Sequence, residues 1–174
     1  SDRDLVERGQ TLRDRISRFG VKTVFIMNDR PDLAVLGNAD GVHVGQDELT
    51  VADVRKIVGP RKLIGVSTHS IEQARQAVRD GANYIGVGPT FASTTKDFAE
   101  FPGVRLLAEV ANEIRLPAFA IGGITLENVD EVLASGIGRV AVSGAICNAG
   151  VPAEEIKKWK DRLVPNLQPP TSNP

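Results

Sequence analysis

The sequence predicts an α/β protein with a parallel β-sheet, and three observations support this class. Short apolar runs alternate with amphipathic stretches along nearly the whole chain. The runs are rich in β-branched residues and apolar on both faces, as in the segment VKTVFIM, which is typical of strands buried on both sides. Glycines or helix-capping residues often mark the ends of the amphipathic stretches. Because alternation of strand and helix is the pattern of parallel sheets, we expect a β/α architecture.

Composition and charge exclude several functional classes. Of the 174 residues, 41% are hydrophobic and 25% are charged, an ordinary globular balance that excludes wholesale disorder. The 21 basic and 22 acidic residues leave a net charge of −1, so we expect no nucleic-acid or membrane partner. The sequence has neither a long apolar run nor a signal-peptide pattern, and its single cysteine, Cys147, cannot form an internal disulfide. We therefore expect a cytoplasmic protein.

The first half of the chain is predicted to contain two helices and three strands. An amphipathic helix covers residues 3–19 and ends at Gly20. Its apolar face carries Leu5, Leu12, Ile16 and Phe19. Thr50 opens the second helix, with Asp53 three residues on as its capping partner. The predicted strands cover residues 21–27, 41–44 and 63–66.

The second half repeats the alternation. Ser70 and Gln73 form a capping box for a helix that Gly81 ends, and Thr125 is the predicted N-cap of a later helix. The predicted elements that follow Gly81 are strands over 84–87, 118–121 and 140–143 and helices over 104–114, 126–134 and 153–163. Residues 164–174 are Pro-rich and polar, which predicts a flexible tail after a domain of residues 1–163.

The segments after the strands favour a (β/α)₈ barrel over a doubly wound open sheet. Polar or glycine-rich residues follow nearly every predicted strand, at the ends where barrels build active sites, whereas an open sheet gathers them at one switch point. The two glycine-rich loops follow the last two of six strands, and phosphate loops of barrels follow the seventh and eighth. We therefore expect an incomplete barrel without its first two strands. A genuinely six-stranded domain is the alternative, and it would leave strand edges exposed.

Three loops have the composition of a phosphate site. Gly122-Gly123 and Ser143-Gly144 each follow an apolar strand, where backbone N–H groups and a helix N-terminus attract anions. The alternative is a tight turn that needs glycine. A third loop gathers hydroxyls and an ammonium group, which suit phosphate oxygens but also occur in solvated surface loops. Its residues are Ser93, Thr94, Thr95 and Lys96.

Acidic pairs at neighbouring strand ends are candidate Mg²⁺ ligands. Asn28-Asp29 and Asp47-Glu48 follow consecutive strands, and Mg²⁺ takes one or two carboxylates plus substrate phosphates. The alternatives are a salt bridge between Asp29 and Arg30 and a turn at Asp47. Ser67 also ends a strand, with His69 as the histidine nearest to it in sequence. It lacks a nucleophile-elbow motif, so we expect it to hydrogen-bond an anion. His43, inside a strand, is expected to be packed.

The sequence resembles a known family, thiamine-phosphate synthase. The resemblance runs in order from about Leu5 to Ala153, and six short motifs in the correct order and spacing carry it. They are Asn28-Asp29-Arg30, Gly41-Val42-His43-Val44-Gly45-Gln46, Gly65-Val66-Ser67, Gly86-Val87-Gly88-Pro89, Thr94-Thr95-Lys96 and Ile121-Gly122-Gly123-Ile124.

The resemblance implies a (β/α)₈ barrel, bound Mg²⁺ and two small-molecule substrates. The family joins 4-amino-2-methyl-5-hydroxymethylpyrimidine diphosphate to 4-methyl-5-(2-phosphoethyl)thiazole and releases pyrophosphate. By this resemblance Asn28 contacts the pyrimidine diphosphate, and Asp29 and Glu48 bind Mg²⁺. Ser67 and Lys96 contact the diphosphate and act in catalysis. The residues implied for the thiazole phosphate are Ser93, Thr95, Gly123, Ser143 and Gly144.

The sequence departs from the family pattern in three ways. Glu48 stands where the family usually has an Asp, so either Asp47 or Glu48 is the second Mg²⁺ ligand. Ser93 replaces a usual Thr and keeps the hydroxyl. The family's Q-x-R-x-K signature, which grips the pyrimidine diphosphate, does not occur in this sequence. Two other interpretations stay open: a related thiazole tautomerase, and an inactive phosphate-binding module or fragment. The sequence also leaves homo-oligomerisation open.

Overall fold

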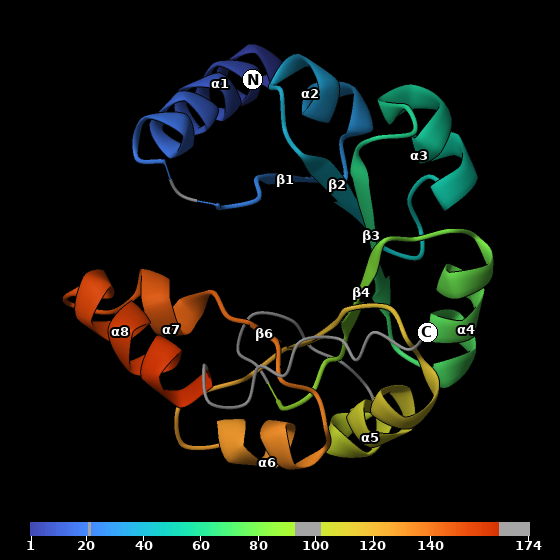
Figure 1. Cartoon of the computed structure of the whole chain (residues 1–174), viewed down its shortest axis with the longest axis vertical. Helices are drawn as coiled ribbons and strands as arrows, with labels where there is room; N and C mark the ends of the chain where they lie inside the picture. The colour runs from blue at the N-terminus through green and yellow to red at the C-terminus, as the bar shows by residue number, and fades with distance from the viewer. Residues whose placement is uncertain (21, 93–101, 164–174) are drawn as a thin grey trace. The chain divides into compact units, whose positions relative to one another are not determined.

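The computed structural model describes residues 1–20, 22–92 and 102–163, in which strands and helices alternate (Figure 1). The strands are β1 (Ile26–Asn28), β2 (Gly41–Val44), β3 (Leu63–Thr68), β4 (Tyr84–Val87), β5 (Ala118–Ile121) and β6 (Val140–Ala141). The helices are α1 (Asp2–Arg18), α2 (Pro31–Leu36), α3 (Val51–Val58), α4 (Ile71–Arg79), α5 (Gly103–Glu113), α6 (Val129–Ala134), α7 (Gly144–Cys147) and α8 (Pro152–Leu163). The predicted tail, 164–174, lies outside the described residues.

The strand order confirms the predicted α/β class and excludes the doubly wound alternative. The strands hydrogen-bond in the sequential order β1-β2-β3-β4-β5-β6, whereas a doubly wound sheet reverses its order at a switch point. The pairs β1–β2, β2–β3 and β5–β6 are parallel. Parallel neighbours place their carboxyl ends at the same edge, so the segments after β1, β2 and β3 lie along one edge.

The chain forms two compact units. The first comprises Ser1–Ser67 and Arg75–Ile85, and the second comprises Thr68–Ala74 and the chain from Gly86 onward. Buried aliphatic side chains of the strands and covering helices form the core of the first unit, with Val42, Val54, Ile64 and Ile85 among those with no exposed surface. The core of the second includes Val87, Leu107, Val110, Val129 and Val132. Leu107 and Val110 of α5 thus face inward.

Helix α1 begins and ends one residue before the predicted range of 3–19, and its apolar face is largely exposed. Leu5, Leu12 and Phe19 are 45%, 44% and 79% exposed, and the buried residue of the helix is Gly9. The apolar side chains on this face are therefore largely in contact with solvent.

Strand β1 is shorter than predicted. The predicted strand over 21–27 is wrong in its first part, because β1 begins only at Ile26. The N–H of Phe25 donates to the Asp40 carboxylate at 2.8 Å, and the N–H of Asp40 donates to the Phe25 carbonyl at 2.8 Å. These two bonds take the place of a strand ladder before Ile26. Residue 21 lies outside the described residues.

Helix α6 also starts later than predicted, and Thr125 is not its N-cap. Asn128 occupies that position, and its side chain is held by the preceding turn. Its Oδ1 accepts from the N–H of Thr125 at 2.8 Å, and its Nδ2 donates to the Gly123 carbonyl at 2.9 Å. A side chain bonded to the preceding loop delays the regular helix by three residues relative to the predicted start at 126.

Two short helices, α2 and α7, were not predicted from the sequence. Both have too few residues to show a helical period. Pro31 in the first turn of α2 is nevertheless a favourable start, because its fixed φ suits that position. Strand β6 ends at Ala141 instead of residue 143, and Ser143 becomes the N-cap of α7.

Among the described residues, no helix has the length and apolar character needed to span a bilayer.

Candidate functional site at the strand ends

Asn28 and Asp29 lie at the carboxyl end of β1, as predicted. Asp29 has a φ of 58°, a left-handed conformation that is uncommon outside glycine and is tolerated by Asp. Its N–H donates to the His43 carbonyl at 2.8 Å, which ties this turn to β2. The Asn28 amide Nδ2 donates to Asp29 Oδ2 at 2.6 Å. Both side chains are exposed, so this strand end presents an amide and a carboxylate.

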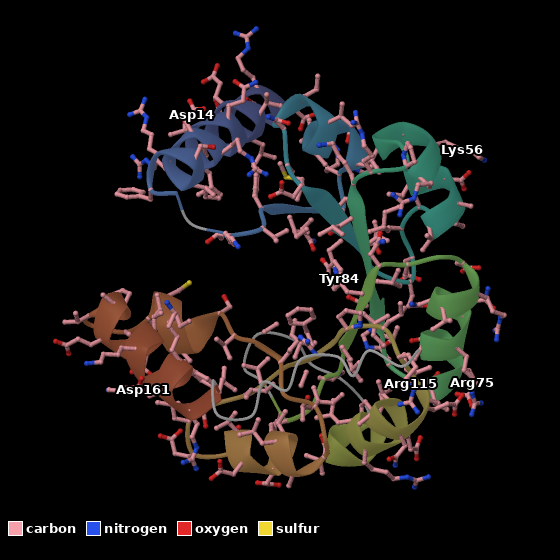
Figure 2. All side chains as sticks on the ribbon, viewed as in Figure 1. Asp14, Lys56, Arg75, Tyr84, Arg115 and Asp161 are labelled. Carbon is pink, nitrogen blue, oxygen red and sulfur yellow. The ribbon has the colours of Figure 1, made fainter. Side chains whose placement is uncertain are left out.

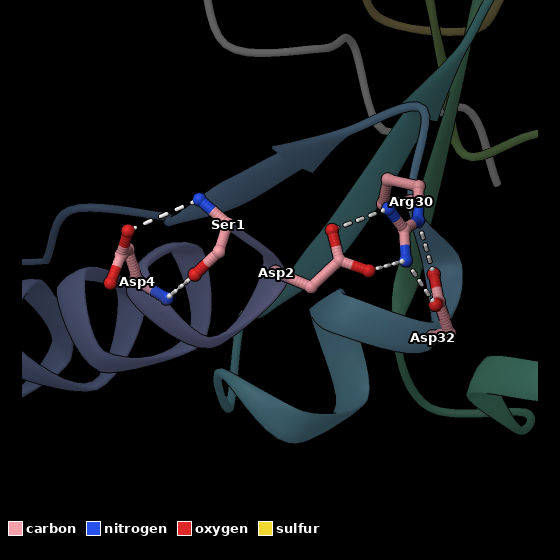
Figure 3. A network of polar contacts seen from close by, with 5 residues as sticks. All are labelled: Ser1, Asp2, Asp4, Arg30 and Asp32. Carbon is pink, nitrogen blue, oxygen red and sulfur yellow. Dashed lines mark hydrogen bonds and ion pairs between the residues drawn. The ribbon is translucent and has the colours of Figure 1, made fainter.

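The alternative in which Asp29 pairs with Arg30 is not what the structure shows. Arg30 binds Asp2 through two hydrogen bonds of 3.0 and 2.9 Å and Asp32 through two of 2.9 and 2.7 Å (Figure 3). Hydrogen bonds from Arg30 lower the pKa of Asp32 to about 2. The guanidinium is thus engaged on α1 and α2.

The segment after β2 carries the second acidic pair. The Glu48 carboxylate folds back over Gly45, the residue that follows β2, so closely that a Cβ at Gly45 would overlap Glu48 Oε2. Gln46 reaches across to β3, where its Nε2 donates to the Ser67 carbonyl at 2.6 Å. Glu48 therefore lies over the carboxyl end of β2 and Asp29 follows the carboxyl end of β1, on neighbouring parallel strands.

Ser67 lies inside β3, which continues two residues beyond the predicted end. The histidine bonded to its hydroxyl is His43 and not His69, with 2.9 Å between Ser67 Oγ and His43 Nε2. The other ring nitrogen of His43, Nδ1, lies 3.1 Å from the hydroxyl of Tyr84 on β4. The two rings lie 5.4 Å apart at 34° (Tyr84 is labelled in Figure 2). Tyr84, His43 and Ser67 thus form a hydrogen-bonded chain across three strands.

Gly65 makes room for this chain. It pairs with His43 in the β2–β3 register, and a Cβ there would overlap the Tyr84 ring. Burial lowers the pKa of His43, against a smaller opposing effect of the Asp29 charge, and burial raises the pKa of Tyr84 to about 12. Both groups are therefore favoured in their neutral forms. The sequence pattern did not single out Tyr84, and it predicted His43 only as a packed residue, because the pairing of Gly65 with His43 depends on the strand register.

The donor set at β1 and β2 suits a hard cation that shares its shell with a ligand. Asp29 and Glu48 supply carboxylate oxygens, which Mg²⁺ prefers. No group of three or more His, Cys, Asp or Glu side chains suited to a metal occurs in residues 1–20, 22–92 and 102–163. Two carboxylates fit Mg²⁺ only where substrate oxygens and water complete an octahedral shell.

In the second unit, the glycine pair after β5 has a clear structural role. Gly122 and Gly123 have φ values of 98° and 62°. A Cβ on Gly122 would lie 2.9 Å from Pro89, and one on Gly123 would lie 2.7 Å from the Phe91 carbonyl oxygen. The tight-turn alternative is therefore sufficient to explain both glycines, and phosphate binding at Gly123 stays a prediction.

Ser143 and Gly144 begin α7, and both are exposed. Gly144 lines a hollow of about 360 Å³ together with residues that follow the glycine pair of β5, so the two predicted phosphate loops approach each other. Two acidic residues, Glu127 and Glu155, also line this hollow, and both carry carboxylates. Because these carboxylates repel anions, a phosphate is better placed at the backbone N–H groups than inside the hollow. The predicted residues Ser93, Thr95 and Lys96 lie outside the described residues.

The fold and the strand ends define a class: a parallel α/β protein with polar side chains at the carboxyl ends of its strands, where such folds place their sites. Comparison with known proteins makes this more specific. The family model described as "Thiamine monophosphate synthase" matches residues 1–146. The chain therefore belongs to this family.

Individual relatives agree with this family membership. A thiamine-phosphate synthase of Rhodopirellula baltica is 59% identical over 128 residues, covering 71% of this chain and 34% of that protein. One of Clostridioides difficile is 39% identical over 159 residues, covering 91% of this chain and 75% of that protein. The solved structure of thiamine phosphate pyrophosphorylase from Pyrococcus furiosus superposes with a TM-score of 0.87 at 30% identity, covering 97% of this chain and 80% of that one.

The chain spans only part of several relatives. It covers 34%, 43% and 44% of the relatives from R. baltica, a Synechococcus and Gloeobacter violaceus.

Proposed function

We propose that this chain condenses 4-amino-2-methyl-5-hydroxymethylpyrimidine diphosphate with 4-methyl-5-(2-phosphoethyl)thiazole to give thiamine monophosphate and pyrophosphate. The observation that carries the proposal is the set of groups at the ends of β1, β2 and β3. These parallel strands present an amide, two carboxylates and a hydroxyl, from Asn28, Asp29, Glu48 and Ser67. Family membership and the names of the relatives support it.

Each of these groups has a role toward the diphosphate. Asp29 and Glu48 would hold Mg²⁺, with diphosphate oxygens completing its shell. When bound, Mg²⁺ neutralises the charge that develops on the leaving pyrophosphate. Asn28 and Ser67 would donate hydrogen bonds to diphosphate oxygens, and Lys96 would add a positive charge.

The reaction balances without a protein nucleophile. The C–O bond between the pyrimidine methylene and the diphosphate breaks, and its electron pair leaves with pyrophosphate. The electron-rich aminopyrimidine stabilises the methylene cation. The thiazole nitrogen then donates its lone pair to the methylene carbon and forms the new C–N bond. No proton has to move in either step, which suits a chain with one cysteine and two histidines.

The thiazole phosphate would serve as a handle that orients the ring nitrogen. We place it at the backbone N–H groups of Gly123 and Gly144 and at hydroxyls of Ser93, Thr95 and Ser143. Its binding energy would go into positioning, which can supply a large part of a rate enhancement.

The test is product formation by the purified chain with both substrates and Mg²⁺. We expect thiamine monophosphate and pyrophosphate in equal amounts, and a loss of at least about a hundredfold in turnover for Asp29→Asn. Asp14→Asn is the matched control, because Asp14 is an exposed acid on α1 (Figure 2). Calorimetry with each substrate gives the binding of each alone.

Three other outcomes would contradict the proposed metal site or the proposed reaction. Turnover by Asp29→Asn equal to that of the unmodified chain at limiting Mg²⁺ would remove the metal role. Binding of the thiazole phosphate alone, without product, would indicate a phosphate-binding module. Isomerisation of a thiazole carboxylate phosphate, without condensation, would indicate a tautomerase.

A further inference from the structure

We propose that Tyr84 and His43 are positioning residues that direct the hydroxyl proton of Ser67 outward, toward an anionic ligand. Tyr84 donates to His43 Nδ1, and His43 Nε2–H donates to Ser67 Oγ. This arrangement rests on the proposed function only for the identity of the anion, a diphosphate. The proton arrangement itself is a property of the chain and can be measured without catalysis.

The distances from the two ring nitrogens of His43 to the neighbouring hydroxyls leave two possible arrangements of the protons. A neutral imidazole has one N–H and one bare nitrogen, and both ring nitrogens of His43 lie at hydrogen-bond distance from hydroxyls, 3.1 Å to Tyr84 and 2.9 Å to Ser67. Two proton arrangements satisfy this geometry. In one, His43 accepts from Ser67 and donates to Tyr84. In the other, His43 accepts from Tyr84 and donates to Ser67.

Only the second arrangement leaves Ser67 able to bind an anion. If Ser67 donates to His43, its single proton is used, and an anion would face lone pairs of Oγ. If Ser67 accepts from His43, its proton is available for a ligand oxygen. Hydrogen bonds to charged groups are stronger than neutral ones, so a bound anion itself favours this direction.

The donor strengths favour the same arrangement. A phenol is a stronger acid than an aliphatic alcohol, so Tyr84 is the better donor to the bare imidazole nitrogen. Burial keeps the Tyr84 proton in place at neutral pH, because it raises the pKa of the phenol to about 12. Tyr84 therefore fixes the tautomer of His43, as second partners of histidine generally do.

The backbone supports this geometry. The Ser67 carbonyl accepts from Gln46 Nε2 at 2.6 Å, which fixes the backbone of β3 at this residue. Gly65 leaves the space between the His43 and Tyr84 rings unfilled by a side chain. Glycine at this position therefore permits the phenol to approach His43 Nδ1.

The direct test is the tautomer of His43 in the ¹⁵N-histidine-labelled chain, read by long-range ¹H–¹⁵N NMR. The chain has two histidines, and loss of one set of signals in His43→Gln assigns them. We expect protonated Nε2 and bare Nδ1 at neutral pH. In Tyr84→Phe we expect the Nδ1–H form to appear. A protonated Nδ1 in the unmodified chain would overturn the inference and leave the proposed function standing.

The second test is a double-mutant cycle on affinity for inorganic pyrophosphate with Mg²⁺, measured by calorimetry. We expect Ser67→Ala and Tyr84→Phe each to weaken binding about tenfold, the loss of one hydrogen bond to an anion. Tyr84→Phe should cost nothing further in the Ser67→Ala background, because Tyr84 acts through Ser67. Equal costs in both backgrounds would indicate a purely structural role and overturn the inference.

The conservative variants separate positioning from packing. His43→Gln can place an amide N–H near the position of Nε2, and we expect it to keep more pyrophosphate affinity than His43→Asn. The reverse ranking would contradict the proposed direction of donation. If the unmodified chain shows the Nε2–H tautomer but binds no magnesium pyrophosphate, the proposed function fails and the proton arrangement stands.

Discussion

Gly65→Ala tests whether the close approach of His43 and Tyr84 is as tight as the structure indicates. The substitution adds one methyl group in the middle of β3. A Cβ at this position would overlap the Tyr84 ring and lie 2.5 Å from His43 Nδ1. Gly65 does not have a positive φ, so an alanine backbone is unstrained there. Any cost must therefore come from the two rings.

Two opposing effects set the magnitude. Alanine is favoured over glycine in a strand by about 0.5–1 kcal/mol, because it loses less backbone entropy on folding. Overpacking of a filled site costs about 1–3 kcal/mol, and loss of the bond between His43 and Tyr84 costs about 1 kcal/mol more. The overlap involves ring atoms on a neighbouring strand, which cannot swing away like the end of a flexible chain. We therefore expect a net loss of about 1–3 kcal/mol in unfolding free energy.

The assay is urea unfolding followed by circular dichroism, with Gly150→Ala as the control. Gly150 has no atom within 4 Å of an added Cβ, so its variant should stay within about 0.5 kcal/mol of the unmodified chain. In a Tyr84→Ala background the cost of Gly65→Ala should shrink, because the main obstacle is gone. A Gly65→Ala chain as stable as the control would refute the geometry on which the positioning inference depends.

Three further predictions concern stability, each read from urea unfolding. Thr68→Val removes a fully buried hydroxyl that donates to a carbonyl 2.9 Å away, and should cost about 1–2 kcal/mol. Leu107→Ala should cost about 2–5 kcal/mol because the side chain is fully buried, whereas Leu36→Ala, at a 60% exposed side chain, should cost far less. Burial would raise the pKa of Asp40, but bonds from Arg13 and a backbone amide outweigh it and lower the pKa. The ionised Asp40 carboxylate therefore stabilises the folded chain above its unfolded pKa of about 3.9, and this stabilisation is lost as the pH falls through the folded pKa. Asp40→Asn should therefore make the unfolding free energy fall less steeply at acid pH.

The sequence predicted the elements whose limits are set by local pattern. Strands β2, β4 and β5 have the predicted bounds, because each is a short apolar run between polar or glycine residues. Two of the errors occur where a side chain bonds to backbone outside its own helix or strand. The Asp40 carboxylate accepts the N–H of Phe25, so regular strand pairing begins only at Ile26. The Asn128 side chain donates to the Gly123 carbonyl, and α6 begins only after Asn128. Such bonds depend on the neighbouring segment, which periodicity within one element does not reveal.

The site was predictable to a similar extent. The position of Asp29 at a strand end follows from the chain's own pattern, because strand ends in parallel sheets carry polar residues. The hydrogen-bonded chain from Tyr84 through His43 to Ser67 does not follow from that pattern, because it depends on the register of three strands. Register is set by pairing between segments far apart in sequence. The same limit explains why nearness in sequence indicates His69 as the neighbour of Ser67, whereas the structure bonds Ser67 to His43.

Charge at the ends of β1 and β2 leads to a prediction about the magnesium dependence of pyrophosphate binding. Two carboxylates, Asp29 and Glu48, lie at the ends of neighbouring strands, and an anion placed beside them is repelled by about 1–4 kcal/mol per charge pair at 4 Å, depending on the local dielectric. Arg30 is engaged by Asp2 and Asp32.

A divalent cation would turn this repulsion into attraction on both sides. We therefore expect calorimetry to detect pyrophosphate binding with Mg²⁺ and none in the presence of a chelator. A combined Asp29→Asn and Glu48→Gln variant should lose the magnesium dependence, since it removes both the ligands and the repulsion. Equal pyrophosphate affinity with and without Mg²⁺ in the unmodified chain would show that the carboxylates do not face the ligand, and the assignment of Asp29 and Glu48 would then be wrong.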